Sequence, residues 1–293
     1  MEKIDQIVFG DNQFFGINHM SQEKAQQLAE KYFDIRNIYR TYDIAFENGI
    51  RAVMLNSNAR AKEICDYFRA NSAKYDDISW YPSIPYPHKY ADLVAEKGIL
   101  SAFNDILFSN NTTMGALSMI AKGGLAAFNK DAVTLMKMLV DLEFKMFEGL
   151  NTKVLFLQNI IVDLMLGYEM GDMFRAYCDY VREKFNVTPG LITQNLPYLK
   201  NKLVEWGIDE VVICSSINKI GYLMSPSVDA YIGTIRSNDS SKYQLMAMCT
   251  LASGAVPAKE AYEFINGLKL QSVVFGASSE KNIKETTRLI QLS

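Results

Sequence analysis

The chain has 293 residues, a hydrophobic share of 49% and a formal net charge of −3 at pH 7. These values are typical of a globular protein with a large core. Because no basic cluster occurs, we expect no nucleic-acid partner. No apolar run reaches transmembrane length, and residues 1–5 contain no apolar signal region, so we expect no membrane association.

Strand and helix signals alternate along the chain, which is typical of a parallel α/β fold. Eight apolar runs are predicted strands: 6–14, 51–55, 78–84, 153–157, 190–193, 210–214, 245–250 and 272–275. Helical patterns cover 21–47, 60–73, 88–97, 172–185, 197–206, 258–266 and 280–290. The strand runs are apolar throughout, which indicates a sheet buried on both faces. The sequence therefore predicts a (β/α)8 barrel forming a single domain over residues 1–293.

The segment 101–150 departs from this alternation. It contains a polar turn at 109–113, the pair Gly123-Gly124 and a helical run over 131–147. We expect a mostly helical insertion between the third and fourth strands. Extra packing on the outer layer, a lid over the site and a dimer surface all remain open, so a homo-oligomer is one of the alternatives.

The four cysteines are far apart and form no CxxC pair: Cys65, Cys178, Cys214 and Cys249. This spacing predicts reduced, buried thiols and a cytoplasmic location.

Active sites of (β/α)8 barrels lie at the carboxyl ends of the strands. Amides and hydroxyls dominate these ends here, and Asp11 is the exceptional carboxylate. An amide offers a donor and an acceptor without titrating, so such a ring suits hydroxyls, carboxamides or phosphate oxygens, and we expect no metal site. The predicted substrate-binding residues are Asn12, Gln13, Asn56, Gln158, Asn159, Gln194, Asn195 and Asn218. The alternative for each is a loop residue that satisfies backbone groups.

Three residues are candidates for proton or covalent chemistry. His19 follows the first strand and is the first acid–base candidate. Lys219 follows the sixth strand, where a lysine can bind phosphate or form a Schiff base. Tyr81 lies in the third strand and could donate a proton. Solvated loop positions for His19 and Lys219, and core packing for Tyr81, are the alternatives.

Small residues follow the last two strands, in Leu251-Ala252-Ser253-Gly254 and Gly276-Ala277-Ser278-Ser279. Loops at these places in a barrel often cradle an anion, because small residues let backbone N–H groups approach an oxygen ligand and a helix begins behind them. We predict that Ser253, Gly254, Gly276, Ser278 and Ser279 hold a phosphate.

With these residues in place, the C-terminal half resembles the aldo-keto reductases. The segment 274–286 is similar to that family's last strand and helix, in which a G-A-S-[SN] turn and an E-N pair hold the adenosine part of NADP. The resemblance implies a nucleotide role for Ser279, Asn282 and Glu285, with Thr286 in place of the family's Asn. Leu251-Ala252-Ser253-Gly254 resembles the turn after strand 7, and Gln194-Asn195 resembles the pair that holds the nicotinamide carboxamide.

The family's catalytic Asp, Tyr, Lys and His do not carry over. Asn56, Ser83 and Asn159 stand where the Asp, the Lys and the His would be, and no tyrosine follows at the family's spacing. We therefore weigh three hypotheses: a barrel enzyme with a rebuilt polar site for a phosphorylated or nucleotide-bearing small molecule, an NADP-dependent oxidoreductase with another proton donor, and a non-catalytic nucleotide-binding or regulatory protein.

Overall fold

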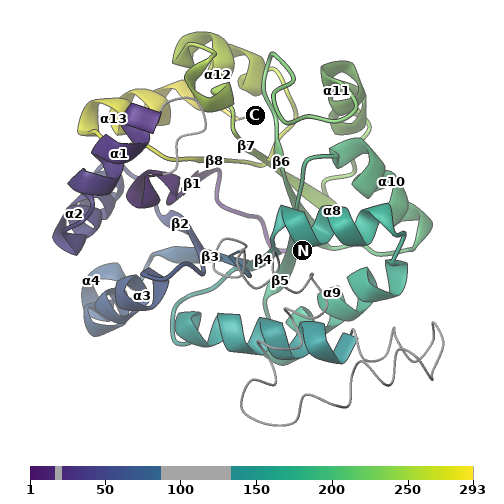
Figure 1. The fold of residues 1–293 in the computed structure, drawn as a ribbon. Coiled ribbons are helices and arrows are strands. Elements are labelled where there is room, and N and C mark those ends of the chain that lie inside the picture. Colours follow the sequence, from purple (N-terminus) through teal and green to yellow (C-terminus); the bar gives the residue numbers. More distant parts are fainter. Residues whose placement is uncertain (17–21, 87–132, 293) are drawn as a thin grey trace.

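The computed structural model describes residues 1–16, 22–86 and 133–292. Eight parallel strands close into a barrel in the order of the chain, which confirms the predicted (β/α)8 fold (Figure 1). The strands are β1 (Ile7–Phe9), β2 (Ala52–Asn56), β3 (Ser79–Ile84), β4 (Val154–Leu157), β5 (Thr188–Thr193), β6 (Val211–Ser216), β7 (Tyr243–Met248) and β8 (Ser272–Phe275).

Two strands stop earlier than the sequence predicts. β1 stops at Phe9, because Asp11 turns aside to accept hydrogen bonds and its carbonyl oxygen accepts from the Phe14 N–H in a 3-10 turn, η1 (Asn12–Phe15). β7 stops at Met248, because Cys249 adopts a left-handed backbone with φ 53°. Both ends therefore become short turns that face the mouth of the barrel instead of continuing the sheet.

The helices form the outer layer and follow the strands in the usual alternation (Figure 1). They are α1 (Gln22–Lys31), α2 (Ile35–Glu47), α3 (Ala61–Ala70), α4 (Ser72–Tyr75), α8 (Asn159–Gly167), α9 (Gly171–Phe185), α10 (Leu196–Glu205), α11 (Val228–Arg236), α12 (Ala258–Asn266) and α13 (Glu280–Leu289), with the 3-10 turns η3 (Lys145–Phe147) and η4 (Ala252–Gly254).

The helix predicted over 21–47 is two helices, because Asp34 caps α2 by accepting a hydrogen bond from the Arg36 N–H. The sequence patterns missed α8 and α11. The helix predicted over 88–97 and most of the insertion predicted over 101–150 lie outside the described residues, although 133–144 is helical.

The core has two parts. Inside the barrel lie Val8, Met54, Tyr81, Phe156, Ile192, Val212, Met246 and Val274. A larger apolar layer joins the outer faces of the strands to the helices. Gly190 stands beside Phe156 in the register of β4 and β5, and a Cβ at Gly190 would lie 2.4 Å from the Phe156 ring. The missing side chain therefore makes room for this ring in the centre of the barrel.

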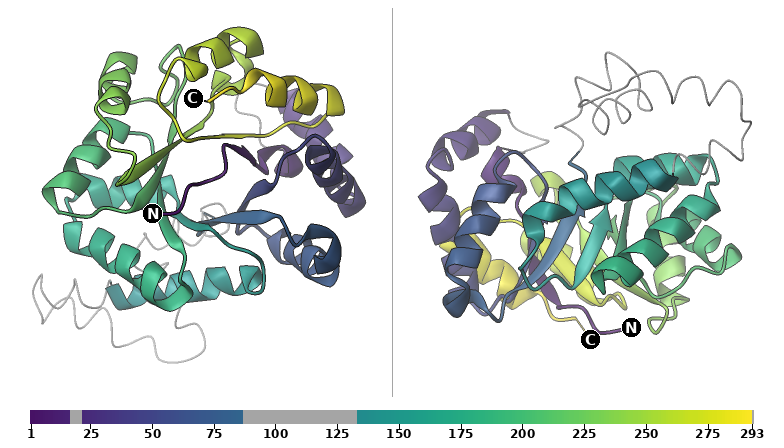
Figure 2. Two further views of the ribbon diagram at one scale, coloured as in Figure 1. Left: turned by 180° about the vertical axis from the view of Figure 1, so that it is seen from behind. Right: turned by 90° about the horizontal axis from the view of Figure 1, so that it is seen from below.

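Both ends of the chain lie at the same end of the barrel (Figure 2). The Ile4 N–H donates to the side chain of Gln244, near the start of β7, which fixes the N-terminal segment at the end where the strands begin. None of the helices in the described ranges is both long and apolar enough to cross a membrane.

Candidate functional site

A cavity of about 1240 Å³ opens at the carboxyl ends of the strands. Its polar lining residues include Asp11, Asn12, Gln13, Asn56, Ser83, Gln158, Asn159, Gln194, Ser216, Ser253, Ser278, Asn282 and Glu285. Met54, Ile192, Met248 and Val274 are among its apolar lining residues. Gly254 and Gly276 both line it, so the turns after β7 and β8 face the same mouth as the amides.

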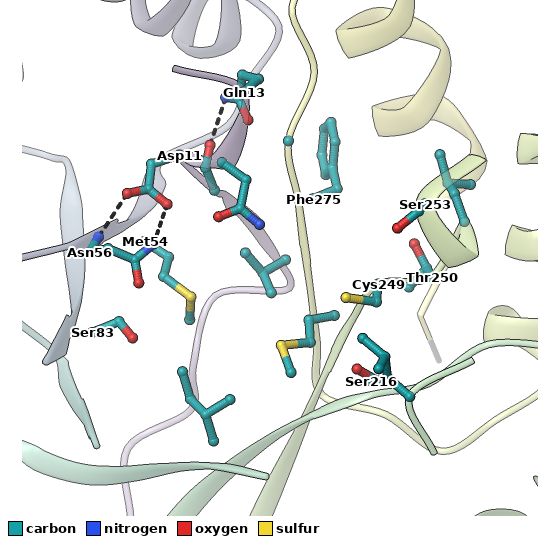
Figure 3. Close-up of a pocket in the computed structure, with 18 of the residues that line it drawn as sticks. Asp11, Gln13, Met54, Asn56, Ser83, Ser216, Cys249, Thr250, Ser253 and Phe275 are labelled. Carbon is teal, nitrogen blue, oxygen red and sulfur yellow. Dashed lines mark hydrogen bonds between the residues drawn. The ribbon is translucent and has the colours of Figure 1, made fainter. Parts of the chain in front are cut away.

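Asp11 is the central charged group of one wall. Only 3% of this residue is exposed, and both carboxylate oxygens accept hydrogen bonds from Asn56, at 2.8 Å from its backbone N and at 2.6 Å from Nδ2. Figure 3 shows Asp11 turned toward Asn56 at this wall. Burial raises the pKa of Asp11 to about 6, and the Asn56 hydrogen bonds oppose the rise. The carboxyl group can therefore exchange a proton near neutral pH.

The amides of this wall form a connected row. The side-chain oxygen of Asn56, Oδ1, accepts a hydrogen bond from Nε2 of Gln158. Together with the bond from Asn56 to Asp11, this contact links the ends of β1, β2 and β4. Gln13 donates through Nε2 to the Gly10 carbonyl oxygen at 2.8 Å. Its Oε1 and the Oγ of Ser83 are buried and have no hydrogen-bond partner among the described residues.

Buried polar atoms without partners are costly, and they often mark a place where a ligand or water completes the hydrogen bonding. Gln13 and Ser83 both line the cavity. The Gln13 oxygen accepts only, whereas the Ser83 hydroxyl can donate or accept. The wall around Asp11 therefore contains two buried polar atoms whose hydrogen bonding is incomplete among the described residues.

The opposite wall comes from β6 and β7. Ser216, Cys249, Thr250 and Ser253 lie across the cavity from Asp11 (Figure 3). Burial raises the pKa of the Cys249 thiol, and the neighbouring Ser216 hydroxyl opposes this. Cys249 is therefore a neutral thiol at pH 7 and a poor nucleophile.

The two predicted phosphate turns differ in the backbone donors that they offer. In the turn after β7, the Gly254 N–H already donates to the Leu251 carbonyl oxygen at 2.8 Å, and Ala252 and Val256 also donate within the turn. In the turn after β8, no backbone hydrogen bond of the described residues uses the N–H groups of Gly276 and Ser278. The Gly254 N–H is therefore not available to a ligand, whereas the N–H groups of Gly276 and Ser278 have no backbone acceptor among the described residues.

Gln194 is held firmly at the end of β5. Its backbone N–H donates to Asp163 at 3.0 Å, and its carbonyl oxygen accepts from the Tyr231 hydroxyl at 2.8 Å and from the Ser225 N–H at 3.0 Å. Burial raises the pKa of Asp163, while hydrogen bonds from Thr193 and Gln194 oppose the rise. The Gln194 side chain therefore enters the cavity from a fixed backbone.

Two of the predicted catalytic residues lie away from the cavity. Tyr81 is fully buried, and its hydroxyl donates to Asp5 at 2.6 Å, which places it at the end of the barrel where the strands begin. Lys219 lies outside, and its Nζ pairs with Glu260 at 2.9 Å. The predicted roles of Tyr81 and Lys219 are thus wrong for a reaction in this cavity. His19 lies outside the described residues.

Three further predicted residues have structural partners instead of facing the cavity. The Asn195 side chain caps α10 by accepting from the Tyr198 N–H, and the Ser279 hydroxyl caps α13 by accepting from the Asn282 N–H. Asn218 is fully buried and exchanges hydrogen bonds with the Tyr222 backbone. For these residues the alternative, satisfaction of loop backbone groups, is the observed role.

Sequence patterns missed the roles of Asp11 and Asp163. Tyr86 lines the cavity after β3, and burial together with the Asp11 charge raises its pKa. The signal that could have found Asp11 was its isolation as the carboxylate among strand-end amides. Its burial, which makes it reactive, depends on contacts with residues 45 positions away.

One side of the cavity is lined by residues that the sequence analysis assigned to a phosphate or a nucleotide. Ser278, Asn282 and Glu285 line it, and a Cβ at Gly254 would meet no atom within 4 Å, so the space before that turn is open. At the other side Gln194 lines the cavity but Asn195 does not. No lysine of the described residues lines it to lower the pKa of a tyrosine. In the described ranges, His, Cys, Asp and Glu form no group of three that could hold a metal ion.

No family model matches the sequence, and no curated protein matches it. Several solved structures do match this chain. A protein assigned as an aldo-keto reductase of Pseudomonas aeruginosa is 10% identical, with 98% of this chain and 89% of that chain covered and a TM-score of 0.59. One assigned as a 2,5-diketo-D-gluconic acid reductase B is 12% identical, with 99% and 84% covered and a TM-score of 0.55.

An aldo-keto reductase from a Medee basin deep-sea metagenome library is 10% identical, with 100% of this chain and 87% of that chain covered and a TM-score of 0.54. At such identities the likeness shows the fold and not the activity. The chain therefore has the same (β/α)8 barrel fold as these aldo-keto reductases.

Proposed function

We propose that this chain is a barrel enzyme that acts by general acid–base catalysis on a small polyhydroxylated molecule carrying a phosphate. Asp11 is the proton-transferring group. The observation that carries the proposal is the buried Asp11 carboxyl group on the cavity wall, with its pKa raised to about 6. A general base or acid works best when its pKa lies near the operating pH.

The hydroxyl groups of the substrate would bind to the wall around Asp11. Gln13 Oε1 needs a donor and Ser83 Oγ needs a partner, and both atoms are buried beside the cavity. Gln158 and Gln194 add amide groups from β4 and β5. A molecule with several hydroxyls satisfies this set, whereas an apolar substrate leaves it unpaired.

The phosphate would lie at the turn after β8. The N–H group of Ser278 is available there, and α13 begins directly behind it. A helix start favours negative charge.

The reaction assigned to Asp11 is proton transfer at a carbon beside a carbonyl group. The ionised carboxylate removes the proton, the electron pair of the C–H bond moves into the carbonyl to give an enediolate, and the proton returns to carbon or oxygen. Asn56 holds both oxygens of the carboxylate and so sets its orientation. No redox cofactor is needed for this step.

The experiment is solvent exchange in D2O. The enzyme is incubated with a panel of aldose and ketose phosphates, and 1H NMR follows the loss of the proton next to the carbonyl. We expect exchange with at least one of these compounds, and Asp11→Asn lowers its rate about 100-fold or more. Asp5→Asn, the same change at the other end of the barrel, is the matched control and keeps the rate. Equal rates for Asp11→Asn and the wild type would reject the role of Asp11.

A second candidate is an NADP-dependent oxidoreductase, and the position of Tyr86 favours it. Tyr86 lines the cavity close enough to Asp11 for its pKa to respond to that charge, so the two could donate the proton to a carbonyl oxygen. A bound NADPH would supply the hydride, and Ser278, Asn282 and Glu285 would hold its nucleotide part. The raised pKa of Tyr86 and the lack of a lining lysine make this candidate weaker.

Titration with NADPH separates the candidates. A saturable fluorescence change together with oxidation of NADPH by aldehydes supports the oxidoreductase. Exchange without NADPH supports the acid–base enzyme. Tight nucleotide binding without either reaction supports a non-catalytic nucleotide-binding or regulatory protein.

A further inference from the structure

A second hollow of about 260 Å³ lies behind the turn after β8. Residues from α1, α2 and the start of α13 line it, and these helices are neighbours on one side of the barrel (Figure 1). Ser278 lines both this hollow and the large cavity. A ligand in the cavity therefore has the hollow as its neighbour across a single turn of backbone.

Two cations, Lys31 and Arg40, line the hollow. Among the described residues, neither Lys31 nor Arg40 forms an ion pair with a carboxylate. The Lys31 ammonium group instead donates to the Ser278 carbonyl oxygen. Burial and the positive charge of Arg40 lower the pKa of Lys31. Because both side chains line the same small hollow, their charges repel each other, and an anion between them would relieve the repulsion.

The backbone around the two cations is fixed. The Asn37 Nδ2 donates to the Lys31 carbonyl oxygen at 2.7 Å, and the Thr41 hydroxyl donates to the Asn37 carbonyl oxygen at 2.7 Å. The first of these bonds joins α2 to the end of α1, and the second lies within α2. The hollow therefore has a defined wall on the side opposite α13, and binding requires little ordering of the backbone.

The α13 side offers N–H donors. This helix has ten residues, and its hydroxyl cap, Ser279, accepts only the Asn282 N–H. The N–H groups of the residues before Asn282 in the first turn have no partner within the helix. Glu280 is the acidic residue among those lining the hollow, so two cations face one carboxylate there.

The large cavity has the opposite charge. Its charged lining residues in the described part of the chain are Asp11 and Glu285, and no cation lines it. A phosphate dianion placed deep in that cavity would be repelled by both carboxylates when they are ionised. The hollow is therefore the electrostatically favourable place for the anionic end of the ligand.

We propose that the hollow between α1, α2 and α13 is a phosphate-binding site in which Lys31 and Arg40 supply the charge and the start of α13 supplies backbone N–H donors. The site takes the phosphate of the molecule whose uncharged part occupies the cavity. Only this last link rests on the function proposed above. The hollow itself is defined by its own residues, whatever reaction the cavity performs.

Isothermal titration calorimetry with inorganic phosphate tests the site without any turnover. We expect saturable binding by the wild type and an affinity about tenfold or more weaker in Arg40→Gln, because charge-assisted hydrogen bonds are lost. Lys31→Gln should weaken binding similarly, and Lys31→Arg, which keeps the charge, should restore most of it. Arg236→Gln, the same change in α11, is the matched control. Glu280→Gln, which removes the opposing carboxylate, should tighten binding.

The outcomes separate the two proposals. Absence of saturable binding, an unchanged affinity in Arg40→Gln, or weaker binding in Glu280→Gln would overturn the phosphate site. If Arg236→Gln weakened phosphate binding as much as Arg40→Gln does, the cause would be general surface charge, and this result would also overturn the phosphate site. Because phosphate binding needs no proton transfer, Asp11→Asn should bind phosphate as the wild type does. The deuterium-exchange assay then tests the proton-transfer role of Asp11 independently of phosphate binding in the hollow.

Discussion

The side-chain oxygen of Gln13 occupies the space in which a side chain at residue 276 would begin. A Cβ at Gly276 would lie 2.1 Å from Gln13 Oε1. Gln13 cannot move away freely, because its Nε2 is bonded to the Gly10 carbonyl oxygen and only 6% of the residue is exposed. The turn after β1 and the turn after β8 are therefore packed against each other through an amide and a glycine.

This contact predicts a strong coupling between the two positions. Gly276→Ala should lower the free energy of unfolding by about 1–3 kcal/mol, because the added methyl group overpacks the contact. In a Gln13→Ala background the same substitution should cost much less, and urea denaturation of the four proteins measures the coupling. Additive effects of the two substitutions would show that the contact is absent.

The Asp11 carboxyl group predicts an unusual pH dependence of stability. Its pKa is about 6 in the folded state and 3.8 is the ordinary value, so the folded state binds the proton more tightly than the unfolded chain does. This contribution is fully present below pH 3.8 and is lost as the pH rises through 6, with a total of about 3 kcal/mol. The difference in unfolding free energy between wild type and Asp11→Asn, measured from pH 4 to pH 7, should fall accordingly. A flat difference would contradict the raised pKa.

Tyr81 should matter for stability and not for the reaction. Its hydroxyl donates to the Asp5 carboxylate and accepts from the Asp5 N–H at 2.9 Å, far from the cavity. Tyr81→Phe should cost about 1–3 kcal/mol of unfolding free energy and leave the deuterium-exchange rate unchanged. Loss of exchange in a folded Tyr81→Phe protein would return this residue to the site.

Thiol labelling should report on the cavity. Cys249 lines it and is partly exposed, whereas Cys65, Cys178 and Cys214 are buried. A maleimide should modify one thiol in the native protein, slowly at pH 7 and faster at pH 9, because the thiol pKa is raised. Cys249→Ser should abolish the labelling. Rapid modification of a second cysteine would contradict the packing of the barrel.

Most of the architecture could be predicted from the sequence, because parallel strands buried on both faces are continuous apolar runs. The predicted strand over 272–275 matches β8 at both ends. The helix pattern failed at Asp34, where a side-chain cap interrupts a run that remains amphipathic on both sides. It also missed α11, whose short pattern was too weak to separate from a loop.

The sequence predicted the place of the polar site at the mouth of the barrel, but it did not predict the position of every residue in it. Asn56 and Gln158 were expected to face the mouth because they end their strands, and both line the cavity. Tyr81 was misplaced because alternation along a strand gives the face of the sheet and not the end of the barrel that a long side chain reaches. Gly254 was misplaced as a donor, because the left-handed Ser253 beside it, with φ 57°, folds the turn onto its own carbonyl oxygens.

The most direct test of the acid–base role is a titration of the Asp11 carboxyl group by 13C NMR, with Asp11→Asn used to assign its signal. We expect this carboxyl group to titrate with a pKa of about 6, above the ordinary value of 3.8 for aspartate. A carboxyl signal that titrates near 4 would leave Asp11 fully ionised at neutral pH, and it would contradict the role that we assign to this residue.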